Sequence, residues 1–511
     1  PTRAALMTGK YPQRTGVEGV ITAANHRDKG LNLQHITVAE ELKKYGYNTS
    51  IYGKWHLGYA PEFNPIMQGY DRFVGFVSGN IDYHSHIDQE GYLDWWKDTV
   101  INNETAYNTD LITQYGVKFI EKNIDHPFFL YLAHEAPHYP YQTRKNKAFR
   151  VEGEKKVRAD VDDISNVYKE MIEIMDEGIG NIVKTLKEHG IHKKTFIFFC
   201  SDNGANKNGN NGNLNGFKGS VYEGGHRVPA IAWYPDKIKS GSKSNELLLS
   251  MDILPTILDL INTKPSAKNI DGISFKSILF NQKKELSERN LFWSFKNQDA
   301  VRSGKWKFIK KTHENKEILE LFDLNNDIGE TKNLLAQYSG IADQMNSKLG
   351  LWKKELKKDK MNNSFETFSK YSLYSPDNAF QMELNYKDSL LYYSLTKNNK
   401  RIINESTLGL IRNKKDLKLE LIDIKEGSHS STWEMTWGPE ENVINSYNSL
   451  SVETIDRNSD LKINFLFRLY DNGLAFRYVF PKEEESFVIE ENFEFSIHGD
   501  PECFLLTHPW A

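Results

Sequence analysis

The chain has 511 residues, of which 39% are hydrophobic, so it is long enough to bury sizeable cores and to form at least two domains. Its formal net charge of -4 at pH 7 offers no basic surface for nucleic acid, so no nucleic-acid partner is expected. No apolar run reaches the length of a transmembrane helix, and the 2 cysteines lie too far apart in sequence to suggest a disulfide framework or a metal cluster.

The first clear elements lie between residues 37 and 53. Thr37 and Glu40 form a capping box, which predicts the start of a short helix, and Gly46 is the expected end of that helix. Residues 47–52 then read as a strand. This strand leads directly into the polar motif GKWHLG at residues 53–58.

Two more strands in this half also end at polar clusters. The continuous apolar runs at residues 127–133 and 195–200 predict strands buried on both faces, and a long helix is predicted between them at 161–189. Strands that alternate with helices predict an α/β fold with a mixed, mostly parallel sheet. In such sheets the ligand crevice lies beyond the carboxyl ends of the strands, where all three polar clusters fall.

The later part of the chain changes character. Short strand-like pieces and a helix over 340–356 predict a small subdomain at residues 291–358, and the charged, Asn-rich stretch that follows predicts a linker at 359–370. From residue 371 onward the pattern predicts an all-β domain, because hydrophobic and polar residues alternate and a hairpin turn follows. The alternating hydrophobic residues are Leu461, Ile463, Phe465, Phe467 and Leu469.

Five short motifs together give the first half a stronger signature than any one of them alone. Taken singly, PTRAALMTG also fits an ordinary helix start, and SDNG is common turn chemistry. In their order and spacing the set resembles the type I, formylglycine-dependent sulfatases. The motifs are PTRAALMTG (1–9), GKWHLG (53–58), APHYP (136–140), SDNG (201–204) and KGSVYEGGHRVP (218–229). The resemblance covers residues 1–358 and implies an alkaline-phosphatase-like fold with a small C-terminal sheet subdomain.

Residues 371–511 resemble the N-terminal β-sandwich domain of glycoside hydrolase family 97. The resemblance is carried by SPDNAFQMEL, LYYSL, WEMTWGPEENVINSYNSL and FRLYDNGLAFRYVFP. It implies a parent protein that also carries a glycosidase module, whose catalytic barrel would follow this domain. An unrelated β-sandwich carbohydrate-binding module is the alternative. Trp433, Trp437 and Tyr447 are expected to be core residues of this domain.

Asp202 and Asn203 are the candidate metal ligands. Their side chains offer the carboxylate and amide oxygens that Ca²⁺ prefers, although Ser-Asp-Asn-Gly alone would equally predict a turn. The sulfatase resemblance implies that two aspartates and the formylglycine, all upstream of Pro1, complete the site of one divalent cation. The formylglycine would stand two positions before Pro1, at a Cys or Ser converted by a maturation enzyme. The 511 residues alone are therefore expected to be inactive.

Arg3, Lys54 and Lys218 are three cations within these motifs. Cations aimed at the oxygens of a sulfate ester stabilise the charge of its transition state. The resemblance implies that Arg3 and Lys54 hold the formylglycine hydrate and that Lys218 binds the sulfate. Taken singly, each lysine would be an ordinary surface cation.

Histidines supply the candidate acid and base, because imidazole can give and take a proton near neutral pH. The resemblance implies that His138, with Lys218, contacts the substrate and protonates the leaving oxygen, and that His56 takes a proton when sulfate is expelled. His134 lies outside the matched pattern and is expected at most to contact substrate. Each histidine could instead be a packing or turn residue.

These features together predict a sulfuric ester hydrolase that removes sulfate from a sulfated oligosaccharide or polysaccharide, in the periplasm or outside the cell. Two alternatives stay open. One is a phosphate or phosphonate ester hydrolase of the same superfamily, since the cations and the metal also suit phosphoryl groups. The other is a non-catalytic carbohydrate-binding protein built on both folds, which would bind sugar without turnover.

Overall fold

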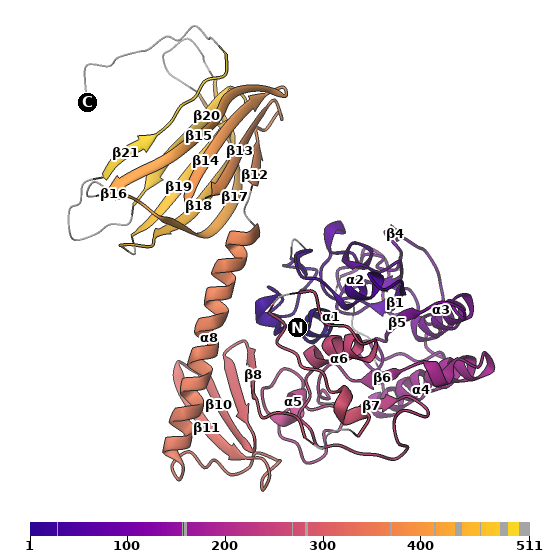
Figure 1. Cartoon of the computed structure of the whole chain (residues 1–511). Helices are drawn as coiled ribbons and strands as arrows, with labels where there is room; N and C mark the ends of the chain where they lie inside the picture. Colours follow the sequence, from indigo (N-terminus) through magenta and orange to yellow (C-terminus); the bar gives the residue numbers. More distant parts are fainter. Residues whose placement is uncertain are drawn as a thin grey trace, which may run out of the picture. The chain divides into compact units, whose positions relative to one another are not determined.

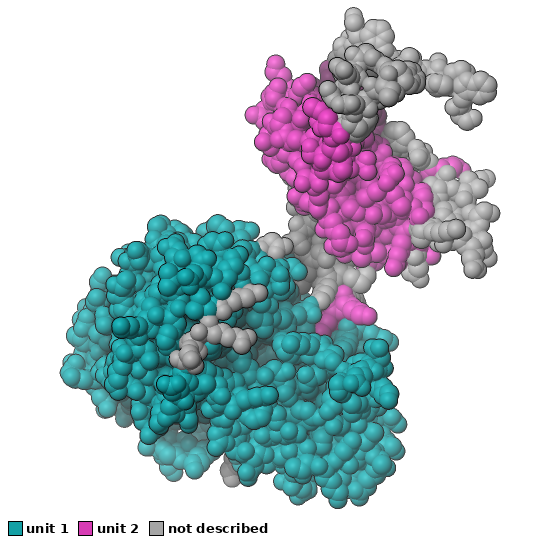
Figure 2. All heavy atoms as spheres, turned by 180° about the vertical axis from the view of Figure 1, so that it is seen from behind, with its two compact units in different colours: residues 1–354 teal, residues 355–511 magenta. Residues whose placement is uncertain are grey.

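The structure is a computed structural model. It contains two compact units. These units are Pro1–Lys354 and Glu355–Ala511, shown in teal and magenta in Figure 2. Among the described helices, none is long and apolar enough to cross a lipid bilayer. The structure describes the whole chain except residues 28, 156, 158–160, 268, 282–284, 368–369, 388, 413–414, 435–441, 460, 481–488 and 500–511.

A five-stranded sheet organises the first unit (Figure 1). Its strands are β1 (Asn48–Lys54), β2 (Arg72–Phe76), β3 (Trp96–Lys97), β4 (Val100–Ile101) and β5 (Phe128–Ala133). They lie in the order β4-β3-β2-β1-β5, with β1 parallel to both β2 and β5 and with β3 antiparallel to β2 and β4. The mixed sheet with parallel strands at β1 confirms the predicted fold class.

Helices pack on both faces of this sheet. The helices of the first unit are α1 (Thr2–Thr8), α2 (Val38–Lys43), α3 (Asn108–Lys122), α4 (Ile164–Glu188), α5 (Glu223–His226), α6 (Ile253–Leu260) and α7 (Lys276–Leu279). Successive residues of β1 point to opposite faces. Ile51 lies in one core with Leu42 of α2, whereas Tyr52 lies in another with Phe119 of α3. The two cores hold β1 in place between them.

The start of α2 follows the predicted capping box. Oγ1 of Thr37 accepts the backbone N–H of Glu40 at 3.2 Å, and the Glu40 carboxylate accepts the N–H of Thr37 at 2.7 Å. The Thr37 hydroxyl also donates to the buried carbonyl of Gln68 at 2.7 Å. α2 therefore begins at a fixed point, and β1 follows it and carries Lys54 to its carboxyl end.

The two apolar strands form as predicted, but their burial was predicted wrongly. β6 (Ile197–Cys200) pairs antiparallel with β7 (Ala230–Trp233), and β5 pairs with β1. Most residues of β5 and β6 are only half-buried, because both strands line a large cavity. A run of apolar residues predicts a strand without showing what packs against it.

A second, antiparallel sheet closes the first unit. Its strands are β8 (Asn290–Phe295), β9 (Gln298–Ser303), β10 (Trp306–His313) and β11 (Lys316–Asp323). The sequence pattern missed β9, whose polar residues carry little strand signal. Helix α8 (Ser339–Thr367) packs here through Trp352, whose ring stacks on Phe292 at 4.8 Å between centroids.

α8 is longer than the predicted helix at 340–356 and extends into the segment predicted as a linker at 359–370. The helix does not end near residue 356 but continues to Thr367. Residues 352–367 contain neither Gly nor Pro, so nothing in that stretch breaks the helix. The charged composition that suggested a linker is equally compatible with an exposed helix.

The second unit consists of two antiparallel sheets. One contains β12 (Lys370–Tyr374), β13 (Phe380–Lys387), β14 (Leu390–Lys397), β15 (Lys400–Arg412), β16 (Lys415–Asp416) and β21 (Ile489–Phe493). The other contains β17 (Leu419–Glu434), β18 (Asn442–Asp456), β19 (Lys462–Tyr470) and β20 (Gly473–Val479). The predicted alternation is confirmed, since the hydrophobic residues of β19 are buried in the core. Tyr447 is not part of that core and instead lies against Tyr470 and His429, whereas the side chains of Trp433 and Trp437 lie outside the described residues.

Candidate active site

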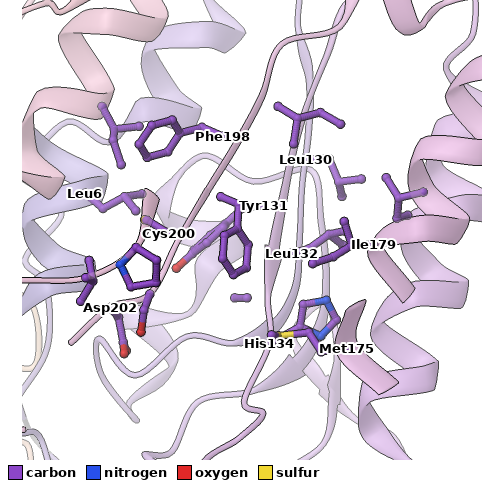
Figure 3. A pocket seen from close by; sticks show the side chains of 18 of the residues that line it. Leu6, Leu130, Tyr131, Leu132, His134, Met175, Ile179, Phe198, Cys200 and Asp202 are labelled. Carbon is purple, nitrogen blue, oxygen red and sulfur yellow. The ribbon is translucent and has the colours of Figure 1, made fainter. Parts of the chain in front are cut away.

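A cavity of about 1580 Å³ lies beside β5, β6 and α4. Figure 3 shows its apolar part, to which β5 contributes Leu130 and Leu132, α4 contributes Ile179 and β6 contributes Phe198. The other part is polar and lies at the carboxyl ends of the strands. It holds Arg3, Lys54, His134, His138, Asp202, Asn203 and Lys218. The structure therefore brings seven of the eight predicted site residues to one cavity.

Arg3 ties together the elements around the polar end. It lies in α1, and its Nη1 donates to the carbonyl of Lys54 at 2.7 Å and to the hydroxyl of Tyr131 at 3.1 Å. Its Nε lies 3.6 Å from Oδ2 of Asp202. One buried guanidinium thus joins the end of β1, strand β5 and the segment after β6. The motif analysis did not include Tyr131, because a tyrosine within an apolar strand gives no signal of its own.

Lys54 is a buried cation beside a buried carboxyl group. Burial lowers the pKa of Lys54 below its usual range, and the positive charge of Arg3 adds to this effect. Burial raises the pKa of Glu135, although the charge of Lys54 opposes that shift. The Glu135 carboxyl group accepts the backbone N–H of Ile81 at 3.0 Å. Sequence reasoning missed Glu135, although an acidic residue within HEAPH, between two candidate histidines, was a usable signal.

His56 stands two residues after Lys54, but it is not among the described residues that line the cavity. Its Nε2 lies 3.0 Å from the carbonyl oxygen of Ile21. Because a carbonyl oxygen can only accept, Nε2 carries the proton. Burial, followed by the charge of Lys54, keeps the pKa of His56 well below its usual value, so the ring is neutral and Nδ1 holds a lone pair. A neutral ring can take a proton at Nδ1, but the lowered pKa makes His56 a weaker base than free imidazole, and its role as a base stays a prediction.

The ring of His138 is also neutral, and its predicted role as a proton donor stays a prediction. Its Nδ1 lies 2.7 Å from the carbonyl oxygen of Tyr139, so Nδ1 carries the proton. Burial, followed by the charges of Lys54 and Lys218, lowers the pKa of His138 to about 3. In this state Nε2 accepts a hydrogen bond rather than donating one.

His134 lines the same cavity and is labelled in Figure 3. Burial lowers its pKa to about 4, so the ring is neutral. Its Nδ1 is buried and has no hydrogen-bond partner among the described residues. The position is compatible with the predicted contact to substrate, and nothing in the geometry adds a catalytic role.

Asp202 and Asn203 follow β6 and present two oxygen-bearing side chains at the polar end. Burial raises the pKa of Asp202, but the charges of Arg3 and Lys54 outweigh it and hold this pKa below its usual range, so Asp202 is a carboxylate. The Asn203 amide donates a hydrogen bond to this carboxylate. These donor types fit Ca²⁺, which takes about six to eight oxygen ligands. The pair alone supplies too few, and the described residues hold no group of three acidic, His or Cys side chains that could bind a metal.

Lys218 lies on the loop that precedes α5. Its backbone N–H donates to the carbonyl of Ala205 at 2.9 Å, and the N–H of Gly204 donates to the carbonyl of Gly225 at 3.0 Å. These bonds hold the Lys218 loop against the segment that carries Asp202. Lys218 as a residue is exposed, but the partial desolvation of its ammonium group beside the cavity lowers the pKa of Lys218, and Asp202 opposes this shift.

Comparison with known families agrees with this geometry. The family described as Sulfatase matches residues 1–263, which is more than half of the chain. The chain belongs to the sulfatase family. The family described as N-sulphoglucosamine sulphohydrolase, C-terminal, matches residues 216–356 of this sulfatase, and that described as Glycosyl-hydrolase 97 N-terminal matches residues 373–510. The predicted fusion of the two kinds of domain is confirmed.

Individual relatives show how much of the molecule is matched. The N-acetylgalactosamine-6-sulfatase of Mus musculus is 35% identical over 57% of this chain and 59% of its own length. The uncharacterized sulfatase YdeN of Escherichia coli is 29% identical over 57% of this chain and 55% of its own length. The crystal structure of Ps i-CgsB in complex with k-i-k-neocarrahexaose is 28% identical, with a TM-score of 0.60, and the match covers 69% of this chain and 81% of that one. The chain thus spans less than two thirds of these two curated relatives.

Proposed function

We propose that this sulfatase hydrolyses sulfate esters of carbohydrates. The observation that carries the proposal is the convergence of Arg3, Lys54 and Lys218 on the polar end of one cavity, beside the carboxylate of Asp202. A sulfate ester is an anion, and its bridging oxygen gains negative charge as the S–O bond breaks. Fixed cations in a poorly hydrated site stabilise that charge more strongly than water does.

The remaining groups of the site are proposed to come from residues upstream of Pro1 in the natural protein. The cavity beside β5 and β6 offers room for such a segment. Asp202 and Asn203 would hold Ca²⁺ together with oxygen ligands from that segment. When present, the formylglycine supplies the nucleophilic oxygen and Ca²⁺ supplies positive charge against the sulfate oxygens.

We propose the following proton transfers, which the lowered pKa values of Lys218, His138 and His56 support. As the S–O bond breaks, the leaving sugar oxygen takes a proton, and the ammonium group of Lys218 is the donor because its lowered pKa makes it a stronger acid than a free lysine. Neutral His138 accepts a hydrogen bond at Nε2 and orients the donor. His56 accepts a proton at Nδ1 in the later step that releases sulfate.

The carbohydrate part of the proposal is supported by what the similar proteins are. One relative is named as an N-acetylgalactosamine-6-sulfatase, and the matched structure of Ps i-CgsB holds a neocarrahexaose. The match to a glycosyl-hydrolase domain supports a substrate that is a polysaccharide, because sulfate groups block glycosidase subsites. The protein is proposed to be matured by a formylglycine-generating enzyme and exported. It would then act on the polymer in the periplasm or outside the cell.

The test uses the natural full-length protein with paired kinetics on 4-nitrophenyl sulfate and 4-nitrophenyl phosphate, together with sulfate release from sulfated oligosaccharides. A higher kcat/KM for the sulfate ester, with release from the sugar, supports the proposal. A higher kcat/KM for the phosphate ester identifies a phosphate or phosphonate ester hydrolase instead. Sugar binding without release of sulfate identifies a non-catalytic binding protein.

The mass of the peptide that precedes Pro1 tests the nucleophile separately. A mass that matches conversion of Cys or Ser to formylglycine, two positions before Pro1, is expected. Any other residue at that position contradicts the proposed chemistry.

A further inference from the structure

A buried ion cluster joins the C-terminal sheet to the loop that carries Lys218. Lys307 of β10 is fully buried, and its Nζ lies 2.9 Å from Oε1 of Glu223 and 2.8 Å from Oε1 of Glu330. Arg302 of β9 places Nη1 3.2 Å from Oε2 of Glu223. The Glu330 carboxyl group also accepts the backbone N–H of Glu223 at 2.7 Å. Arg227 also places Nη1 3.4 Å from Oε2 of Glu223, so three basic and two acidic side chains meet in this part of the first unit.

The charge on Glu223 depends on these partners. Burial raises the pKa of Glu223, but the charge of Lys307 and the other cations outweigh burial and lower this pKa to about 2. Glu223 is therefore a carboxylate although only 1% of it is exposed. A buried charge that loses its partner is strongly unfavourable, so the cluster opposes any movement that separates Glu223 from Lys307.

The two residues before Glu223 are attached to the same sheet. Val221 is buried in a hydrophobic core with Ile309 of β10. The hydroxyl of Tyr222 accepts a hydrogen bond from Lys311 Nζ at 2.5 Å and donates one to Glu320 of β11. Val221, Tyr222 and Glu223 are thus all attached to the sheet. Val221 is held by apolar packing, Tyr222 by its hydroxyl group and Glu223 by its carboxylate.

The other side of α5 contacts the active site. The carbonyl of Gly225 accepts the N–H of Gly204, which directly follows the candidate ligands Asp202 and Asn203. The fit is close, because a Cβ atom added at Gly204 would lie 1.8 Å from the carbonyl oxygen of Gly224. Lys218 stands five residues before Glu223, on the loop that leads into α5. A displacement of Glu223 would therefore be passed to the sulfate-binding cation and to the metal-binding segment.

We propose that Glu223 and Lys307 are positioning residues of the active site, and that the β8–β11 sheet thereby helps to set the geometry of catalysis. This inference rests on the proposed function, because it concerns how Lys218 and the Asp202–Asn203 pair are placed for sulfate ester hydrolysis. Neither residue touches substrate in this scheme. The effect of each is transmitted through the backbone of α5 and the Lys218 loop.

The experiment removes the buried charge in the natural full-length protein and then restores the balance. Lys307→Met keeps the length of the side chain, leaves Glu223 with Arg302 and Arg227, and removes the ion pair of Glu330 with Lys307. Lys307→Met/Glu330→Gln removes one charge of each sign. The matched control is Lys310→Met on the same strand, because Lys310 pairs with Glu317 at 2.5 Å but both side chains are partly exposed.

In Lys307→Met, kcat for 4-nitrophenyl sulfate is expected to fall by about a hundredfold, with a smaller change in KM. A displacement of about 1 Å in a catalytic site has an effect of that size. The Ca²⁺ concentration for half-maximal activity is expected to rise, and the double variant is expected to recover part of both losses. Lys310→Met is expected to match the wild type. Unchanged kcat, KM and Ca²⁺ dependence in a folded Lys307→Met protein would overturn the inference.

Amide hydrogen exchange keeps the inference testable without enzymatic activity. Peptides covering residues 203–206 and 216–226 are expected to exchange faster in Lys307→Met than in Lys310→Met. Equal exchange of these peptides in Lys307→Met and Lys310→Met would overturn the positioning role, even if the wild type hydrolyses sulfate esters. If the peptides exchange faster in Lys307→Met but the wild type is inactive, only the proposed function is refuted. If Lys307→Met does not fold, Glu223→Gln, which keeps the shape of the side chain, is measured in the same way.

Discussion

Gly204→Ala adds a single methyl group at the closest approach between the Asp202 segment and α5. The new Cβ atom would lie 1.8 Å from the carbonyl oxygen of Gly224 and 2.8 Å from its carbonyl carbon. Cβ atoms are essentially never found within 3.0 Å of another atom, so one of the two backbones must move by more than about 1 Å. The first backbone carries Asp202 and Asn203, and the second follows the loop that carries Lys218, so a movement of either is expected to change the site.

Two effects of different size are expected from this displacement. Overpacking of an interior position costs about 1–3 kcal/mol of the free energy of unfolding. A displacement of about 1 Å between catalytic groups lowers the rate by about a hundredfold. Activity is therefore expected to fall far more than stability, and the two are measured as kcat/KM on an aryl sulfate and as the midpoint of urea unfolding.

Gly180→Ala is the matched control, because it adds the same methyl group to an exposed position of α4 with no atom within 4 Å. An alanine in a helix is favoured over glycine by about 0.5–1 kcal/mol, so this variant is expected to be slightly more stable and fully active. A Gly204→Ala protein that keeps the kcat/KM of the wild type would refute the reasoning, since the segment and α5 could then separate without consequence.

Three further predictions follow from individual residues. Thr37→Ala removes the cap of α2 and the donor to the buried Gln68 carbonyl. The free energy of unfolding, measured by urea denaturation, is expected to fall by about 2 kcal/mol. A decrease of less than about 0.5 kcal/mol would contradict this prediction. Lys54 is charged only below its lowered pKa, so kcat/KM is expected to fall as the pH rises through that pKa, which lies below the usual lysine value of 10.5. In Lys54→Arg this fall is expected at a higher pH, because arginine stays charged. Asp202→Asn removes the carboxylate of the candidate Ca²⁺ pair. The Ca²⁺ concentration for half-maximal activity is expected to rise by about tenfold or more. An unchanged Ca²⁺ titration would show that Asp202 is not a ligand.

Local features of the fold could be predicted because their causes lie within a few residues. The capping box of Thr37 and Glu40 marks the start of α2, and the period of two in β19 marks its buried face. The polar clusters after β1, β5 and β6 could be identified for the same reason, since each directly follows an apolar strand, but β6 belongs to a separate two-stranded sheet with β7. α8 was predicted too short because charged residues suit a linker and an exposed helix equally well.

The features that could not be predicted depend on contacts between distant segments. The half-burial of β5 and β6 depends on the cavity between them, and the contact of Arg3 with the Lys54 carbonyl joins residues 51 positions apart. The neutral state of His138 results from burial and from Lys54 and Lys218, which strand β1 and the loop before α5 bring close to it. Glu223 was visible in the motif KGSVYEGGHRVP, but its partner Lys307 lies on a strand with no recognisable motif.

The proposed function requires that the cations around Asp202 promote the hydrolysis of a sulfate ester. It is tested most directly by the rate at which the natural full-length protein and its Lys218→Ala variant release inorganic sulfate from a sulfated oligosaccharide. The account predicts release by the wild type and a loss of at least about a hundredfold in the variant, with the unfolding midpoint nearly unchanged because the Lys218 side chain is exposed. Equal rates for the two proteins, or no release of sulfate by a wild type that carries formylglycine, would contradict it.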